Sequence, residues 1–220
     1  MGQYELPQYD IKIKLITTEK ILKVTQTIEY RNGTPKALKT LYLNDWSHAY
    51  SSSKSPLAQR FAEEYDRRFY LGSKAKRGET SELKIFINNK EINWFRKENQ
   101  LDIIRISLSK DLMVDEQINI RLSYNIEMPD ARYTGYGIVS EKEFYLKNCF
   151  IQIAPFIDGK WITNSNLDLE ETSALPANFY LEWDVPIHLN VNSNLTQWKV
   201  SKTKDRKLIS QSISKAKEIQ

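Results

Sequence analysis

The sequence has few of the residues that usually carry metal, redox or nucleophilic chemistry. Among 220 residues there are one cysteine, Cys149, and two histidines, His48 and His188. A single cysteine excludes an internal disulfide and leaves the cellular compartment open. The motifs His-Glu-x-x-His, Cys-x-x-Cys and Gly-x-Ser-x-Gly and a glycine-rich phosphate loop do not occur. We therefore expect no metal site and no complete catalytic site in this chain, which by itself is not an enzyme.

Long apolar runs and a strong charge imbalance are also lacking. No stretch approaches the ~18 consecutive apolar residues of a membrane span, so none is expected. The net charge of +4 comes from 32 basic and 28 acidic residues that are interleaved. Nucleic-acid binding would need basic residues gathered on one face, so no nucleic-acid partner is expected. The local basic runs at 67–68, 74–77 and 199–217 are interpreted as solvated faces or a frayed end.

Alternation with a period of two dominates the chain and predicts β-strands. It places apolar residues on one face of segments 9–15, 22–30, 83–87, 104–108, 118–126 and 179–191, with turns at 17–20, 88–90, 109–116 and 202–206. Ile92 and Trp94, which follow the turn at 88–90, predict the returning strand of a hairpin. Pro186 inside the longest alternation predicts an edge strand or a bulge. The expected fold is mainly β: an antiparallel or mixed sandwich or saddle. We assign residues 9–213 to one β domain, residues 1–8 to a trimmed N-terminal end and residues 214–220 to a tail.

One segment breaks this pattern. Between Pro56 and Leu71 apolar residues recur at helical spacing, with Ser55 as a candidate N-cap and Gly72 as a stop. One short inserted helix is expected near residues 56–70.

The candidate chemical groups are sparse, and each has a structural interpretation. Asp45 precedes His48 by three residues, but one carboxylate beside one histidine falls short of a ligand set or a triad. Cys149 lies in an apolar stretch and is expected to be a small buried hydrophobe. Five aromatic residues could form a stacking platform for ligands or belong to the core, and alternation favours the core: Tyr42, Trp46, Tyr50, Trp94 and Trp161.

The order of segments resembles the N-terminal β domain of the aminopeptidase N family of zinc metallopeptidases, in its bacterial branch. The segments that carry the resemblance are Tyr9 to Ile13, Ile28 to Asn32, Leu41 to Trp46 with Ala49-Tyr50, and Phe144 to Phe150 followed by Ala154-Pro155-Phe156 and Gly159-Lys160-Trp161. The zinc-binding His-Glu-x-x-His of that family would lie beyond Gln220. The resemblance therefore implies a catalytic domain, with its zinc, that is absent from this chain.

Within the resemblance, Lys147 and Asn148 stand where active family members carry a threonine-glutamine pair. That glutamine helps to hold the substrate's N-terminal residue, so Asn148 is the candidate substrate-binding residue, with a side chain one methylene shorter. The resemblance further implies a non-catalytic domain that caps the active-site cleft, with its own catalytic domain and a peptide substrate as partners. An exposed apolar docking face is then expected. Together with the trimmed start at Met1-Gly2, the resemblance predicts a periplasmic, envelope or secreted location after removal of a signal peptide.

Two other functions remain open. The chain could be a free-standing β-sandwich module of the bacterial surface that binds peptide or glycan, which would need an exposed aromatic face with polar groups in a groove. It could also be a purely structural sandwich in a multidomain secreted protein.

Overall fold

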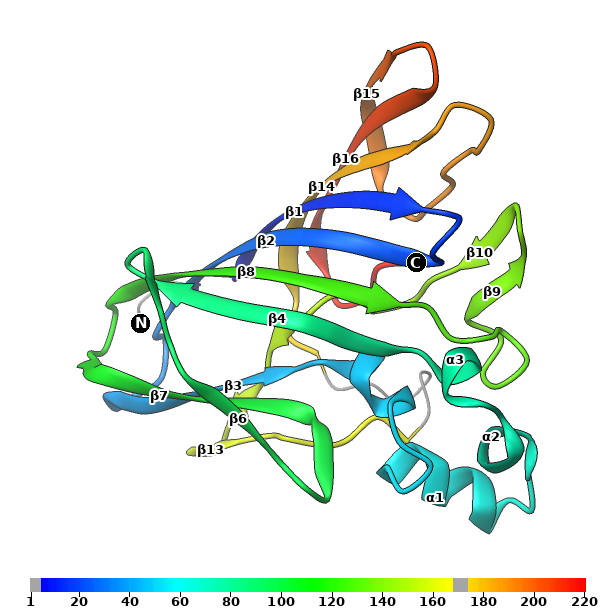
Figure 1. Ribbon diagram of the computed structural model, residues 1–220. Helices are drawn as coiled ribbons and strands as arrows, with labels where there is room; N and C mark the ends of the chain where they lie inside the picture. The colour runs from blue at the N-terminus through cyan, green and yellow to red at the C-terminus, as the bar shows by residue number, and fades with distance from the viewer. Residues whose placement is uncertain (1–4, 168–173) are drawn as a thin grey trace.

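A large twisted sheet forms one side of the molecule in the computed structural model, which describes residues 5–167 and 174–220 (Figure 1). Within those residues its strand order is β15-β16-β14-β1-β2-β8-β4-β5. The strands are β1 (Gln8–Ile16), β2 (Ile21–Arg31), β4 (Glu79–Ile87), β5 (Lys90–Glu91), β8 (Gln117–Glu127), β14 (Ala177–Pro186), β15 (Thr196–Lys202) and β16 (Arg206–Ala216). β1 and β14 run parallel, whereas the other neighbours are antiparallel. The predicted mainly β, mixed-sheet fold is confirmed.

Alternation explains the register of this sheet. In β1 the inward residues Tyr9, Ile11 and Ile13 are buried and the residues between them are exposed. Tyr9 lies opposite Phe179 of β14, and the two rings stack with centroids 4.8 Å apart. A shift by one residue would turn this apolar face to solvent, so burial fixes the register.

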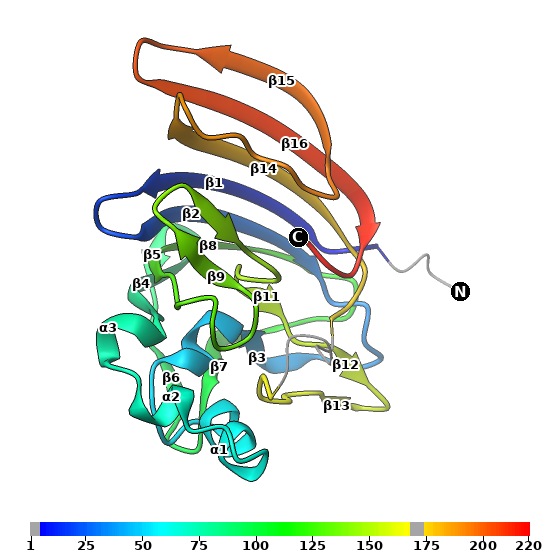
Figure 2. The ribbon, with the colours of Figure 1, turned by 90° about the vertical axis from the view of Figure 1, so that its right-hand side faces the viewer.

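A smaller sheet packs against the apolar face of the large one (Figures 1 and 2). Its order is β11-β3-β7-β6, with β3 (Leu38–Asn44), β6 (Trp94–Lys97), β7 (Gln100–Leu112) and β11 (Gln152–Ile153). Ile28 and Ile120 of the large sheet and Leu41, Leu43 and Ile106 of the small one belong to a single core cluster. Two hairpins complete the described strands: β9 (Gly137–Ser140) with β10 (Glu143–Tyr145), and β12 (Phe156–Ile157) with β13 (Lys160–Trp161).

The inserted helical segment differs from the single helix expected from the sequence. A 3-10 helix, η1 (Trp46–Tyr50), precedes three short helices, α1 (Pro56–Glu63), α2 (Arg68–Leu71) and α3 (Lys74–Arg77), within the described residues. Ser55 caps α1 as predicted, accepting a hydrogen bond from the Ala58 N–H at 3.2 Å. The helix breaks at Tyr65, whose φ is 61°. Asp66 Oδ1 accepts the Arg68 N–H at 2.9 Å, and α2 begins at Arg68. No helix within the described residues is long and apolar enough to cross a membrane.

Three further expectations need correction. β14 lies between β1 and β16, so it is not an edge strand; Pro186 is simply its last residue, where no further ladder bond is needed. β7 continues to Leu112, which shortens the turn predicted at 109–116. The chain forms the predicted hairpin through β4 and β5, but Trp94 then begins β6 in the smaller sheet.

The two ends of the predicted domain also differ in detail. Residues 214–220 do not leave the fold as a tail, because β16 extends to Ala216 and Ile219 is buried in the core. At the other end β1 begins at Gln8, and residues 1–4 lie outside the described residues.

Candidate functional site at the 143–149 loop

Asn148, the predicted substrate-binding residue, lies in the loop that follows β10. It is buried, and its backbone has a φ of 46°, in the left-handed region. Its N–H donates to the Ile219 carbonyl at 2.9 Å, and its Oδ1 accepts the Ile219 N–H at 3.1 Å. Asparagine suits both demands, because it tolerates this conformation and has an acceptor on a short side chain. In the structure Asn148 therefore joins this loop to the C-terminal segment, and substrate contact stays a prediction.

Lys147, the other residue of the predicted pair, is also buried. Its ammonium lies 3.6 Å from the half-exposed carboxylate of Glu218 and 5.8 Å from the centre of the Tyr136 ring. A buried ammonium needs such partners to offset its lost hydration. Lys147 and Asn148 thus both hold the C-terminal segment against the loop.

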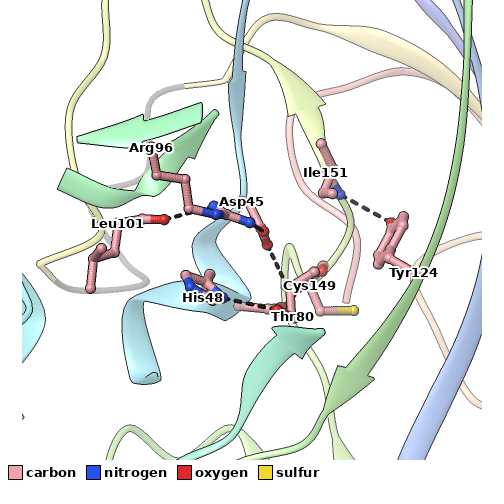
Figure 3. A network of polar contacts seen from close by, with 9 residues as sticks. Asp45, His48, Thr80, Arg96, Leu101, Tyr124, Cys149 and Ile151 are labelled. Carbon is pink, nitrogen blue, oxygen red and sulfur yellow. Dashed lines mark hydrogen bonds and ion pairs between the residues drawn. The ribbon is translucent and has the colours of Figure 1, made fainter. Parts of the chain in front are cut away.

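A polar pair inside the core, Gln26 and Tyr124, fixes the next part of this segment at Ile151. Figure 3 shows the contact between Tyr124 and Ile151. Gln26 of β2 donates from Nε2 to the Ile151 carbonyl at 2.6 Å, and its Oε1 accepts the Tyr124 hydroxyl at 2.6 Å. The Tyr124 oxygen in turn accepts the Ile151 N–H at 3.3 Å. A glutamine at an inward position of an alternating strand was the sequence signal for this brace. The prediction from the sequence did not include this contact.

η1 also contacts this segment, at Cys149. Ser47 Oγ donates to the Cys149 carbonyl at 2.9 Å. The Cys149 side chain is partly buried, and burial raises the pKa of its thiol to about 12. At neutral pH this group is a thiol rather than a thiolate, so it is a poor nucleophile, in line with the predicted hydrophobic role.

Asp45 and His48 do not form the core of a metal site or a triad (Figure 3). The buried Asp45 carboxylate accepts from Arg96 Nη2 at 2.5 Å and from Thr80 Oγ1 at 2.6 Å. His48 Nδ1 instead lies 3.0 Å from the Thr80 carbonyl, which requires the tautomer that is protonated at Nδ1. Burial, and secondly the charge of Arg96, lower the pKa of His48. No group of three or more His, Cys, Asp or Glu that could hold a metal occurs in the described part of the chain.

A second carboxylate extends this buried cluster. Asp102 accepts from Ser165 Oγ at 2.8 Å and from the Asn166 N–H at 2.5 Å, and its carbonyl accepts the Asp45 N–H at 2.7 Å. Burial raises the pKa of Asp102 despite these hydrogen bonds. Through Asp45, Arg96 and Asp102 this cluster connects the end of β3, β6 and β7 to Ser165 and Asn166, so its role is structural.

A groove of about 890 Å³ opens beside Cys149. Its walls come from the apolar face of the large sheet, the 187–195 loop, the C-terminal segment and the β9-β10 hairpin, and they include Leu22, Phe144, Leu146, Leu181, Trp183, Val185, Leu189 and Ile219. Lys142 and Glu143 add charges on the hairpin side. The Trp183 indole N–H is buried and has no hydrogen-bond partner among the described residues. The walls of the groove are therefore mainly apolar, with polar residues along the 190–194 loop and charged residues on the hairpin side.

The five aromatic residues weighed as core or ligand platform are not exposed. Trp46 and Tyr50 are buried, and Tyr42, Trp94 and Trp161 are half-buried. Tyr42 and Trp161 pack with ring centroids 5.9 Å apart. The core interpretation is thus confirmed for Trp46 and Tyr50. Trp94 and Trp161 pack against the edge of the core, and Tyr42 packs on Trp161.

Comparison with solved structures identifies proteins of similar fold. The crystal structure of M1 zinc metallopeptidase from Deinococcus radiodurans matches at a TM-score of 0.50 and 13% identity, covering 94% of this chain and 38% of that chain. A variant of that enzyme bound to a Tyr-Ser-Ala substrate and a two-domain M1 zinc metallopeptidase variant bound to L-arginine both match at 0.51, with the same identity and coverage. The chain shares its fold with part of an M1 zinc metallopeptidase.

The similarity is one of fold, because only 13% of residues are identical. No protein-family model matches the sequence. No curated protein matches it either. The chain spans about 38% of the length of the metallopeptidases that it resembles.

Proposed function

We propose that this chain is the non-catalytic N-terminal domain of a zinc metallopeptidase, which packs on a catalytic domain and caps its active-site cleft. The observation that carries the proposal is the coverage of the fold match: 94% of this chain corresponds to only 38% of a zinc peptidase. A domain of this kind contributes by positioning the peptide rather than by chemistry. The zinc would be held by the partner domain.

The groove beside Cys149 is the proposed docking surface for the catalytic domain. Apolar surface in a groove of this size is unfavourable in water, and docking an apolar segment there would remove it from solvent. Asn148 and Lys147 hold the loop whose residues Leu146 and Cys149 line the groove, so a contact with the peptide's amino end would come from this loop. The proposed location is the periplasm, the envelope or the cell exterior.

The test compares this chain with the full-length product of its gene for bound zinc and for cleavage of aminoacyl reporter substrates. The proposal expects zinc and cleavage in the longer protein alone. A Leu189→Glu substitution in the groove should weaken the association of the two domains expressed separately, whereas Leu208→Glu, on the opposite face of the large sheet, should not. A full-length protein without zinc and without activity would contradict the proposal.

One observation favours the alternative, a free-standing peptide- or glycan-binding module. Trp198 of β15 is 53% exposed and packs on Tyr180 of β14 with ring centroids 5.6 Å apart. Exposed aromatic rings can stack on sugar rings or peptide side chains. A glycan array and a peptide array, each repeated with Trp198→Ala, would test this alternative; binding that needs Trp198 would support it.

A further inference from the structure

The helical insertion, residues 54–77, carries three large apolar side chains that the fold leaves in solvent. Tyr65 is 92% exposed, Leu71 75% and Tyr70 69%, and these are the highest values among the large hydrophobic residues that the structure describes. Scattered exposed hydrophobes are common, but three within seven residues form a local concentration. Figures 1 and 2 place the helices of the insertion at the end of the molecule opposite β15.

These side chains are not left over from a poorly packed insertion. The insertion has a core of its own, in which Phe69 is buried and packs on Tyr50, Phe61 and Tyr133 with centroids 6.2, 5.4 and 5.0 Å apart. Leu57 is fully buried in the same core. The apolar side chains Leu57 and Phe69 of the insertion are therefore buried in this core. Tyr65, Tyr70 and Leu71 lie outside this core.

The backbone holds Tyr65 outward at a cost. Its φ of 61° is unusual for an aromatic residue and is imposed by the turn between α1 and α2. Asp66 stabilises that turn: its Oδ1 accepts the Arg68 N–H at 2.9 Å, and its carboxylate pairs with the Arg68 guanidinium at 2.6 Å. Because the contacts between Asp66 and Arg68 hold this turn despite the strained φ of Tyr65, the exposed position of Tyr65 is a defined feature of the fold.

The insertion also carries the positive charge of the chain. Residues 54–77 contain seven Lys or Arg and three Asp or Glu, a net charge of +4, which equals the net charge of all 220 residues. Two of the acidic residues are neutralised in ion pairs, Glu64 with Arg60 and Asp66 with Arg68. Three exposed cations, Lys54, Arg67 and Lys76, make no ion pair with a described residue. The remainder of the chain is electrically balanced.

From these observations we propose that the insertion docks on the surface of an anionic lipid bilayer, independently of the function proposed above. Basic side chains are attracted to anionic headgroups, and tyrosine and leucine side chains enter the interfacial layer below them. Tyr65, Tyr70 and Leu71 are each at least 69% exposed, so they suit a deformable surface better than a rigid partner, which would need a matching pocket for each side chain. Lys54, Arg67 and Lys76 would contact lipid phosphates, and Tyr65, Tyr70 and Leu71 would enter the interface.

The test measures co-sedimentation of the chain with vesicles of phosphatidylcholine alone and with vesicles containing about one third phosphatidylglycerol. Binding should require the anionic lipid and weaken as salt is raised. The apolar variant Tyr65→Ser/Tyr70→Ser/Leu71→Ser and the charge variant Arg67→Gln/Lys76→Gln should each lower the partition coefficient at least about tenfold. Their exposed positions leave the fold intact, which circular dichroism and the thermal midpoint would check.

Matched controls remove the same features elsewhere. Met113→Ser/Val114→Ser removes exposed apolar side chains, and Lys84→Gln/Lys199→Gln removes two exposed charges. Both controls should bind vesicles like the unmodified chain. The proposal is overturned if the chain does not co-sediment with anionic vesicles, or if the control variants and the insertion variants lose vesicle binding to the same extent. It is also overturned if sedimentation without lipid shows that the insertion mediates self-association and vesicles do not compete with it.

Discussion

Asn148 and Ile219 exchange two hydrogen bonds although they lie 71 residues apart: the Asn148 N–H donates to the Ile219 carbonyl, and the Ile219 N–H donates to Asn148 Oδ1. This reciprocal pair closes the loop after β10 against the last residues of the described chain. Both groups are buried, so no solvent replaces a lost partner. The side-chain amide of Asn148 therefore contributes to the stability of the proposed site together with the Lys147–Glu218 ion pair.

Replacing Asn148 by Ala should lower the free energy of unfolding by about 1–3 kcal/mol, because the Ile219 N–H then stays buried without its acceptor. The left-handed backbone adds a penalty for alanine, which Asn148→Gly would relieve. Urea denaturation measures the free energies of unfolding of Asn148→Ala and Asn148→Gly.

The matched control is Asn178→Ala, which removes an equivalent bond at an exposed position, from the Lys215 N–H to the Asn178 Oδ1 at 3.2 Å. It should cost clearly less, since water replaces the lost acceptor. Equal losses for Asn148→Ala and Asn178→Ala would show that the Asn148 amide is not critical.

Arg96→Met should be among the most destabilising single changes. It leaves the Asp45 carboxylate buried without its cation, and it also removes the hydrogen bond from Arg96 Nη1 to the Leu101 carbonyl at 2.6 Å. Breaking one half of a buried pair typically costs about 3–5 kcal/mol. Arg60→Met breaks the exposed pair with Glu64 and should cost under ~1 kcal/mol. Chemical denaturation measures the free energy of unfolding of both variants. A similarly small loss in Arg96→Met and in Arg60→Met would refute the structural role of the Asp45 pair.

Stability should fall as the pH is lowered through the range in which His48 titrates. The folded-state pKa of His48 is lowered by burial from 6.5, so in the window below that value the unfolded chain binds more protons than the folded one. The free energy of unfolding contributed by His48 is therefore present above the unfolded pKa and is lost on acidification. Urea midpoints measured between about pH 7.5 and 5 would follow this loss.

His48→Gln should reduce that slope, while His188→Gln, at an exposed position, serves as the control and should leave it unchanged. An unchanged slope in His48→Gln would mean that another group carries the pH dependence.

Cys149 should react slowly with thiol reagents. Because burial raises the pKa of the thiol to about 12, the thiolate is scarce at neutral pH, and labelling should be at least about tenfold slower than in the urea-unfolded chain. A Cys149→Ser/Ser109→Cys variant, with its thiol on an exposed strand position, gives the rate of an accessible group. In a longer protein with the catalytic domain docked in the groove, Cys149 should be protected further. Rapid labelling at neutral pH would contradict the buried position.

Much of the fold could be predicted because the relevant signal is local. β1, β2 and β8 coincide with segments in which apolar residues alternate mainly with polar or charged residues. The hairpin turn at Thr17 to Lys20 lies between β1 and β2. The Ser55 cap was predictable for the same reason, since its partner is the N–H of Ala58 three residues away. The break at Tyr65 was not predictable, because continuous helical spacing gives no sign that the chain will turn there and begin a second helix at Arg68.

The candidate site was much less predictable. The resemblance directed attention to Asn148, but nothing near it in the sequence indicates that Ile219 takes up its amide. Asp45 and Arg96 are 51 residues apart, and the short spacing from Asp45 to His48 suggested a different partner.

The sequence by itself thus determined where β1, β2 and β8 lie and which of their faces are apolar, because both follow from neighbours along the chain. It also determined the concentration of positive charge in residues 54–77. Only the tertiary structure decided that β14 is an inner strand and that Asn148 is committed to Ile219. It also decided that Tyr65, Tyr70 and Leu71 stay in solvent while Phe69 is buried. These outcomes depend on which distant segments compete for the same partner or the same core space, and that competition is settled only when the whole chain packs.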